Sequence, residues 1–191
     1  MKLKVAMLAS ALTLTSAPAL AHTATMPENS SLLSGLLHPL TGLDHLLAML
    51  AIGAWAALQK DTQRLQIPLT FVLMLMAGFA LGLSTFSLPM VESGIATSVL
   101  ILGLLVMTSA RLPVAATLGL TSTFAVLHGY AHGAEAQVAS LTSFAAGFLG
   151  TSAALHFIGG TMTHTFKTSM PMLAKLAGFA IAATGAGLLA A

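Results

Sequence analysis

The sequence contains no cysteine and very few charged side chains. The absence of cysteine among 191 residues excludes disulfide bonds, thiolate metal ligands and cysteine nucleophiles. A metal site would therefore have to use histidine, carboxylate, methionine or backbone groups. Charged residues make up 6% of the chain, whereas soluble domains carry about 25%. With 57% hydrophobic residues and a mean hydropathy of +0.93, the composition excludes an ordinary water-soluble domain and indicates a membrane protein.

Clustered positive charge is also lacking. The formal net charge is only +2, and the seven lysines and arginines are scattered singly along the chain. A nucleic-acid-binding protein would carry a basic patch or stripe. We therefore expect no nucleic-acid partner, and the lipid bilayer is the expected surrounding of most of the chain.

The first 21 residues have the three parts of a bacterial secretory signal. Two lysines precede an apolar run over residues 5–14, and the small residues Ala19 and Ala21 form a cleavage site. The run is short for a membrane span, which favours a signal over an uncleaved helix. We predict a signal peptide over residues 1–21 and a single transmembrane domain over residues 22–191. The mature N-terminus is then expected on the periplasmic side of a bacterial inner membrane.

About six apolar segments follow, each long enough, or nearly so, to cross a hydrocarbon core of about 30 Å at 1.5 Å per helical residue. They cover residues 36–58, 67–86, 94–110, 113–127, 138–157 and 172–189. The third and fourth are short and adjacent, so we expect a tight helical hairpin there. An outer N-terminus places the basic residues of the mature chain on the cytoplasmic side, in agreement with the positive-inside rule. The predicted fold is all-α, a polytopic membrane bundle of about six transmembrane helices.

A pair of glycines in the second expected span indicates close helix packing. Gly78 and Gly82 are four residues apart, and the missing side chains of such a pair let another backbone approach closely. The partner helix belongs either to the same chain or to another subunit of a homo-oligomer.

Three polar side chains lie at the start of the first expected span, in the sequence HPLTGLDH. They are His38, Asp44 and His45. An ionised aspartate at the bilayer centre costs about 2.5 to 3.5 kcal/mol, so Asp44 should face a polar cavity, a cation or another helix. Pro39 and Gly42 are expected to interrupt the helix. We predict that the distorted helix start brings the three polar side chains together.

A second polar cluster, HGYAHGAE, follows the fourth expected span. Its spacing would place His128, His132 and Glu135 on one helical stripe, and two imidazoles with a carboxylate suit a divalent cation. Gly129 and Gly133 would also permit a broken or re-entrant segment. Both clusters fall on the outer side of the expected topology, which predicts a two-part metal site there.

The ligand types favour a borderline divalent ion. Imidazole with carboxylate and water suits Ni²⁺ or Co²⁺, and ligand type alone leaves Zn²⁺ open. Further candidate ligands are His22 at the mature N-terminus, Met49 one turn beyond His45, and His156 near the inner end of the fifth span. Helix packing and hydrogen bonding are the alternative roles of Met49 and His156. No prosthetic group is expected, because the metal would be cargo.

The two clusters, with Met49 after the first, resemble the signature motifs of the HupE/UreJ membrane proteins, and the resemblance extends over the whole chain. It implies a secondary permease for Ni²⁺, or for Co²⁺ in some members, linked to the maturation of hydrogenase or urease. It also implies a metal-binding role for the histidines and carboxylates of both motifs. The sequence contains no Walker-type glycine-rich loop, which agrees with transport that does not use ATP. The alternatives are an intramembrane zinc-dependent hydrolase, using the HxxxH of His128 and His132, and a metal sensor that binds without transport.

Overall fold

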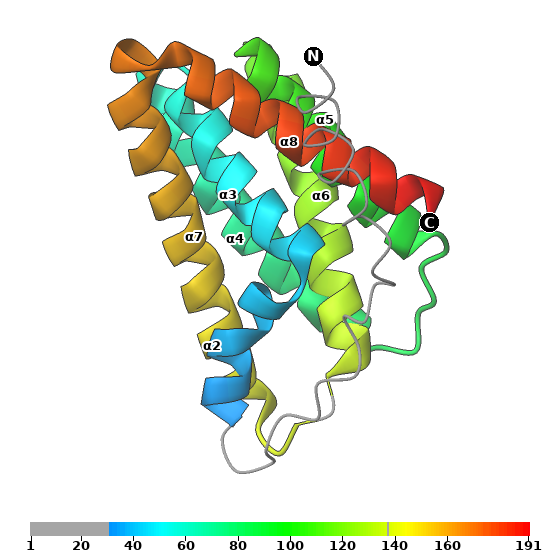
Figure 1. The fold of residues 1–191 in the computed structure, drawn as a ribbon. Coiled ribbons are helices and arrows are strands. Elements are labelled where there is room, and N and C mark those ends of the chain that lie inside the picture. The colour runs from blue at the N-terminus through cyan, green and yellow to red at the C-terminus, as the bar shows by residue number, and fades with distance from the viewer. Residues whose placement is uncertain (1–30, 137) are drawn as a thin grey trace, which may run out of the picture.

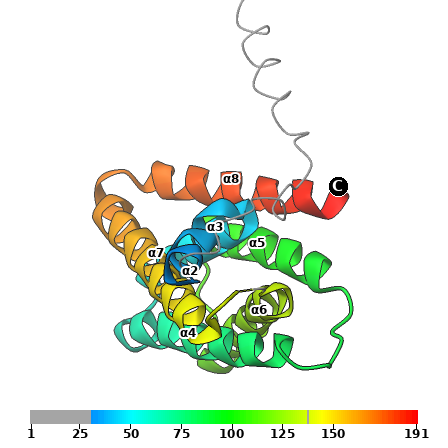
Figure 2. The same ribbon diagram turned by 90° about the horizontal axis from the view of Figure 1, so that it is seen from below.

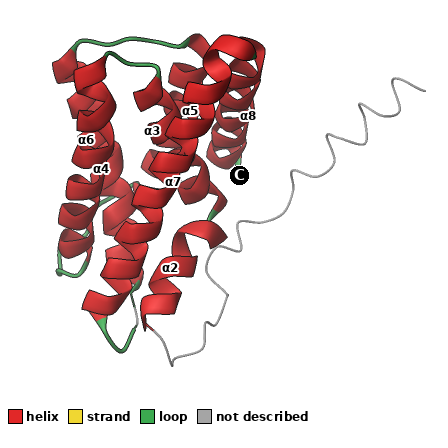
Figure 3. Cartoon of the chain, turned by 90° about the vertical axis from the view of Figure 1, so that its left-hand side faces the viewer, coloured by secondary structure: helices red, strands yellow, loops and turns green. Residues whose placement is uncertain are grey.

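The structure is a computed structural model that describes residues 31–136 and 138–191. The signal peptide expected over residues 1–21, and His22, lie outside the described residues. All regular structure in the described part is α-helix, so the predicted all-α fold is confirmed (Figures 1 and 3). The helices are α2 (Ser31–Thr41), α3 (Leu43–Ala57), α4 (Asp61–Gly82), α5 (Val91–Thr108), α6 (Val114–Glu135), α7 (Leu141–Ser169) and α8 (Pro171–Ala190).

The helices α4 to α8 are each long and apolar enough to cross a membrane. The pair α2 and α3 adds a sixth crossing if it is counted as one broken span. The chain is therefore a multi-pass membrane protein. Some helices extend beyond the predicted spans: α4 begins earlier, at Asp61, α6 continues to Glu135, and α7 continues to Ser169.

The first predicted span, residues 36–58, is not one regular helix. The axes of α2 and α3 differ by 80°, and Gly42 at the break has an extended backbone with φ −89° and ψ 117°. The interruption predicted from Pro39 and Gly42 is thus present. α2 continues through Pro39 and ends two residues later, at Thr41. The proline has no N–H to donate within the helix, which weakens the last turn of α2.

The hairpin predicted for the third and fourth spans is present in part, since α5 and α6 contact each other, for example through Ser98 and His128. A short segment, residues 109–113, joins α5 to α6, but α6 packs mainly against α4 and α5 packs mainly against α8. The packing between α5 and α8 is close, because a Cβ added at Gly103 would lie 2.3 Å from the backbone nitrogen of Ala182. Sequence proximity did not determine the helix pairing here.

Gly78 and Gly82 pack within the chain, against α6. A Cβ added at either position would lie 2.3 Å from a carbonyl oxygen, that of Val126 or that of Tyr130. α6 presents its own glycines to α4 in return, and a Cβ at Gly129 would lie 2.0 Å from the carbonyl oxygen of Leu75. The two helices therefore touch along their backbones, which fixes the position of the second motif.

α3 lies at the centre of the bundle, with α4, α5, α7 and α8 around it (Figure 2). Ten of its fifteen residues are buried. Trp55 is fully buried near the end of α3, and its Nε1 donates a hydrogen bond of 2.9 Å to the carbonyl oxygen of Ala110.

The bundle has two ends of different character. One end, called the motif end, carries α2, the end of α6 and the start of α7, at the bottom of Figure 1, and α3 begins directly above α2. The opposite end carries the α3–α4, α5–α6 and α7–α8 junctions. The basic residues of the described part all lie at or near this opposite end; they are Lys60, Arg64, Arg111, Lys167 and Lys175.

Candidate metal-binding site

The two histidine motifs meet at the motif end. The Nε2 of His38 lies 2.7 Å from the Nδ1 of His132, and the Nε2 of His132 lies 3.0 Å from the Nδ1 of His45. These pairs are 94 and 87 residues apart in sequence. The structure thus joins the α2–α3 break to the last turns of α6 through one continuous row of imidazoles.

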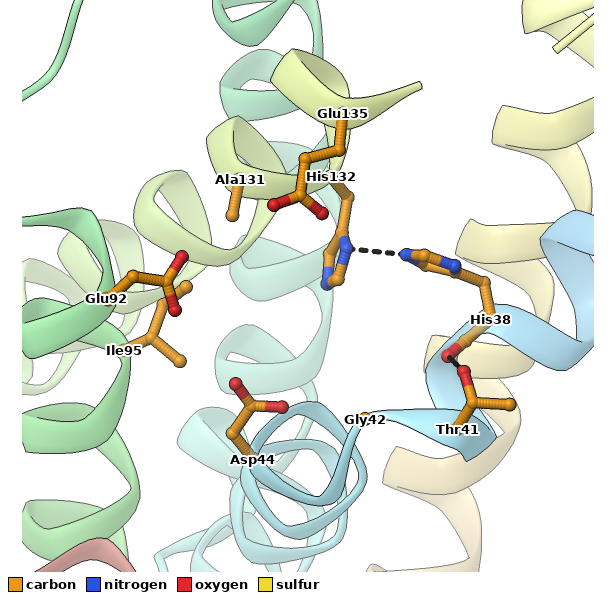
Figure 4. Close-up of a pocket in the computed structure, with 9 residues that line it drawn as sticks. All are labelled: His38, Thr41, Gly42, Asp44, Glu92, Ile95, Ala131, His132 and Glu135. Carbon is orange, nitrogen blue, oxygen red and sulfur yellow. Dashed lines mark hydrogen bonds between the residues drawn. The ribbon is translucent and has the colours of Figure 1, made fainter. Parts of the chain in front are cut away.

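A pocket opens beside this row, and Figure 4 shows its lining. The residues that line it are His38, Thr41, Gly42, Asp44, Glu92, Ile95, Ala131, His132 and Glu135. The carboxylates of Asp44, Glu92 and Glu135 turn toward the same space (Figure 4). The cavity volume is about 30 Å³, which has room for an ion with one or two waters, since one water needs about 10 to 15 Å³. We call the five ionisable residues of this lining the outer layer.

The helix break places Asp44 in the pocket. Asp44 lies in the first turn of α3, where the positive end of the helix dipole stabilises a carboxylate. Its Oδ1 accepts a hydrogen bond of 2.7 Å from the backbone N–H of His45. A Cβ at Gly42 would lie 3.0 Å from the same oxygen, so glycine leaves room for the carboxylate.

Two further imidazoles lie behind the outer layer. His45 and His128 are fully buried, and their ring centroids are 5.2 Å apart. The Nε2 of His45 lies 3.3 Å from the Oγ of Ser152, and the Nε2 of His128 lies 2.9 Å from the Oγ of Ser98. These four residues form the inner layer. His132 joins the two layers, because it contacts both His38 and His45.

The second motif is continuous helix. α6 is regular as far as Glu135, so Gly129 and Gly133 do not break it and serve instead the close contact with α4. His128, His132 and Glu135 follow one another along the helix, as their spacing predicts. They lie at different depths: His128 is fully buried, His132 is half-buried and Glu135 is exposed.

Sequence reasoning missed three members of these layers. Glu92 belongs to neither histidine motif, although its carboxylate lines the pocket. Ser98 and Ser152 are single hydroxyl residues in apolar helices, and no local pattern marks them. Only the packing of α5 and α7 onto the histidines brings these side chains to the site.

Two other candidate ligands lie away from the pocket. Met49 is fully buried and belongs to the apolar core around α3. His156 lies on α7 and is 4% exposed. Its ring contacts the ring of Phe71 edge to face, with 5.1 Å between the centroids.

The nitrogen separations in the imidazole row are those of neighbouring metal ligands. Within residues 31–136 and 138–191, no three histidine, aspartate or glutamate side chains form a ready-made chelate. However, two ligands at right angles on an ion with bonds of about 2.1 Å are about 3.0 Å apart. An ion binding one nitrogen of His38 and one of His132 would replace their hydrogen bond, and both rings would have to turn so that their lone pairs point at the ion. Neighbouring carboxylates and water are available to complete its coordination.

Comparison with known proteins identifies the relatives of this chain. The model of the family described as HupE / UreJ protein matches residues 10–188. Protein HupE of Rhizobium leguminosarum bv. viciae is 37% identical over 174 residues, which cover 90% of this chain and 91% of that protein. No solved structure matches the chain. These matches set aside the hydrolase alternative, because the family consists of transporters and not of enzymes. The chain belongs to the HupE/UreJ family of membrane proteins, which is associated with nickel and cobalt transport.

Proposed function

We propose that this protein is a secondary, ATP-independent permease that carries a divalent transition metal across the bacterial inner membrane. The observation that carries the proposal is the convergence of His38, Asp44, His132 and Glu135 on one pocket in a bundle of membrane-spanning helices. Ni²⁺ is the favoured cargo and Co²⁺ the alternative, because both combine imidazole with carboxylate and water. The cavity of about 30 Å³ suits a small ion and is too small for a lipid or a peptide.

The motif end is assigned to the periplasmic side. All five basic residues of the described part lie at or near the opposite end, which the positive-inside rule places in the cytoplasm. The expected signal peptide supports the same orientation. Transport from the motif end to the basic end is then uptake.

The two layers support capture followed by transfer. Three carboxylates around one pocket attract a hydrated cation, and imidazoles of the outer layer then replace some of its waters. Conduction requires binding strong enough for selection and weak enough for release. The exposed carboxylates of Glu92 and Glu135 suit the capture step, and the buried pair His45 and His128 suits the following step.

The imported metal would serve the maturation of a metalloenzyme, hydrogenase or urease. This link rests on the family alone. A homo-oligomer also stays a prediction, although the glycine pair that suggested one packs within the chain at Gly78 and Gly82.

Flux into liposomes tests the proposal. The purified protein is reconstituted with a metal-sensitive dye inside, and Ni²⁺ or Co²⁺ is added outside. We expect Asp44→Ala and His45→Ala to lower the initial rate at least tenfold. His164→Ala is the matched control, because His164 is an exposed histidine of α7 that does not line the pocket. Stoichiometric binding without flux in the unaltered protein would favour the sensor and refute the permease.

A further inference from the structure

His156 is a buried histidine that the two-layer site does not use. It is 4% exposed, and neither its Nδ1 nor its Nε2 has a hydrogen-bond partner within the described residues. A buried polar atom without a partner destabilises the fold, because it has lost its hydration without compensation. A leucine or phenylalanine would fill the same space without this cost. Packing alone therefore does not explain a histidine at this position.

The ring of His156 lies next along the interior after the inner layer. Ser152, which contacts His45, precedes it by one turn of α7, a rise of about 6 Å. The ring of Phe71 contacts His128 of the inner layer and also His156, with centroid distances of 6.2 Å and 5.1 Å respectively. His156 is thus the next imidazole on the way from the motif end toward the basic end.

Buried polar groups also lie on α6, on the side of His128 that leads to the basic end. On α6, Thr121 and Thr117 lie on the same face as His128, seven and eleven residues before it, and both are fully buried. The Oγ1 of Thr121 has no hydrogen-bond partner in the described part of the chain. The Oγ1 of Thr117 accepts a hydrogen bond of 3.4 Å from the Nε2 of Gln63, near the basic end. Buried oxygen groups therefore lie on α6 between His128 and the basic end.

The backbone of α7 holds His156 in place. A Cβ added at Gly53 of α3 would lie 1.9 Å from the carbonyl oxygen of His156, and one at Gly159 would lie 2.1 Å from that of Leu50. Because α3 and α7 touch so closely here, the backbone at residue 156 is fixed, and burial of the ring against Phe71 restricts the rotation of the imidazole. Such a group can serve as a ligand without first being ordered by the ion.

We propose that His156 is an inner transit ligand, which receives the divalent metal from the inner layer and releases it toward the basic end. The proposal rests on the proposed function, since it assigns a step of that transport. A single imidazole with water or hydroxyl ligands binds an ion weakly, which suits a transit position.

The first test separates transport from binding. In His156→Leu the ring is replaced by an apolar group, so we expect an unchanged or higher melting temperature. Ni²⁺ binding at the motif end, measured by titration of the purified protein, should stay within about twofold, while the flux of Ni²⁺ into liposomes falls at least tenfold. His164→Leu should leave both unchanged. A wild-type rate in His156→Leu would overturn the proposal.

The second test excludes a merely structural role. The chain has no cysteine, so His156→Cys introduces a unique thiol, and thiolate prefers softer ions than imidazole does. We expect the ratio of Cd²⁺ flux to Ni²⁺ flux to rise at least fivefold above that of the unaltered protein. An unchanged ratio would show that residue 156 does not contact the ion, and it would overturn the proposal. This test does not depend on whether His156→Leu folds. No metal flux in the unaltered protein would instead refute the permease itself, before any variant is compared.

Discussion

Replacing Gly129 with alanine should disturb the site through the contact between α4 and α6. The added Cβ would lie 2.0 Å from the carbonyl oxygen of Leu75, whereas an ordinary contact needs at least 3.4 Å. The neighbouring atom is backbone and cannot rotate away, so the two helices must separate by more than 1 Å. Overpacking of this kind costs about 1 to 3 kcal/mol. A loss of 2 kcal/mol lowers the melting temperature of a chain of this size by about 4 to 8 °C.

The same displacement should impair transport. His128 precedes Gly129 directly, and the 2.9 Å contact between its Nε2 and the Oγ of Ser98 would not survive a shift of 1 Å. We therefore expect Gly129→Ala to lower the initial flux of Ni²⁺ into liposomes at least tenfold. Thermal unfolding in detergent, followed by the fluorescence of Trp55, gives the melting temperature.

Gly119→Ala is the matched control on the same helix. An added Cβ at Gly119 meets no atom within 4 Å, so only helix propensity changes. Propensity favours alanine by about 1 kcal/mol, and we expect an unchanged or slightly higher melting temperature with normal flux. Equal behaviour of the two variants would refute the close contact between α4 and α6.

Three further predictions concern the layers of the site. Glu92→Gln removes one of the pocket carboxylates, so the external Ni²⁺ concentration for half-maximal uptake should rise several-fold, and an unchanged value would show that Glu92 takes no part in capture. Ser98→Ala removes the hydroxyl that lies 2.9 Å from His128; flux should fall a few-fold with the fold intact by circular dichroism, and normal flux would exclude a role in transport. Imidazole binds metal only when neutral, and its reference pKa is about 6.5, so uptake should decline as the external pH falls through about 6. Undiminished uptake at pH 5 would contradict capture by histidine.

The helices were predictable because each span is a long apolar run, but hydropathy reports contact with lipid and not helicity. For this reason the predicted spans stop short in α6 and α7. The last turns of α6 carry glycine and histidine, and α7 continues through threonine and lysine to Ser169. These segments stay helical because the helix satisfies their backbone groups, whatever their side chains are.

The site was predictable only where polar side chains interrupt an apolar run. His38, Asp44 and His45 stand out in this way, and so do the histidines of the second motif. Glu92 and Ser152 do not stand out in this way. Glu92 lies at the start of α5, and Ser152 is a single small hydroxyl residue within α7. They join the site because α5 and α7 pack against it, and such contacts between distant segments leave no local pattern.

The break at Gly42 allows a single histidine of α6 to join both histidines of the first motif. In an unbroken helix His38 and His45 would lie about 10 Å apart along one face. The break instead lets each of them contact a different nitrogen of His132, at 2.7 and 3.0 Å.

A break among membrane helices leaves backbone carbonyls without helical partners, and such groups must be satisfied within the protein. The hydroxyl of Thr41 donates a hydrogen bond of 2.9 Å to the carbonyl oxygen of His38, which is one of the last four carbonyls of α2. The hydroxyl of Thr151 on α7 donates one of 2.9 Å to the carbonyl oxygen of Leu36, earlier in the same helix. Because Thr151 belongs to α7, the helix that carries His38 is held in place by the packed bundle and not by the first motif alone. The convergence of the histidines is therefore a property of the whole fold, which is why neither motif could form this arrangement by itself.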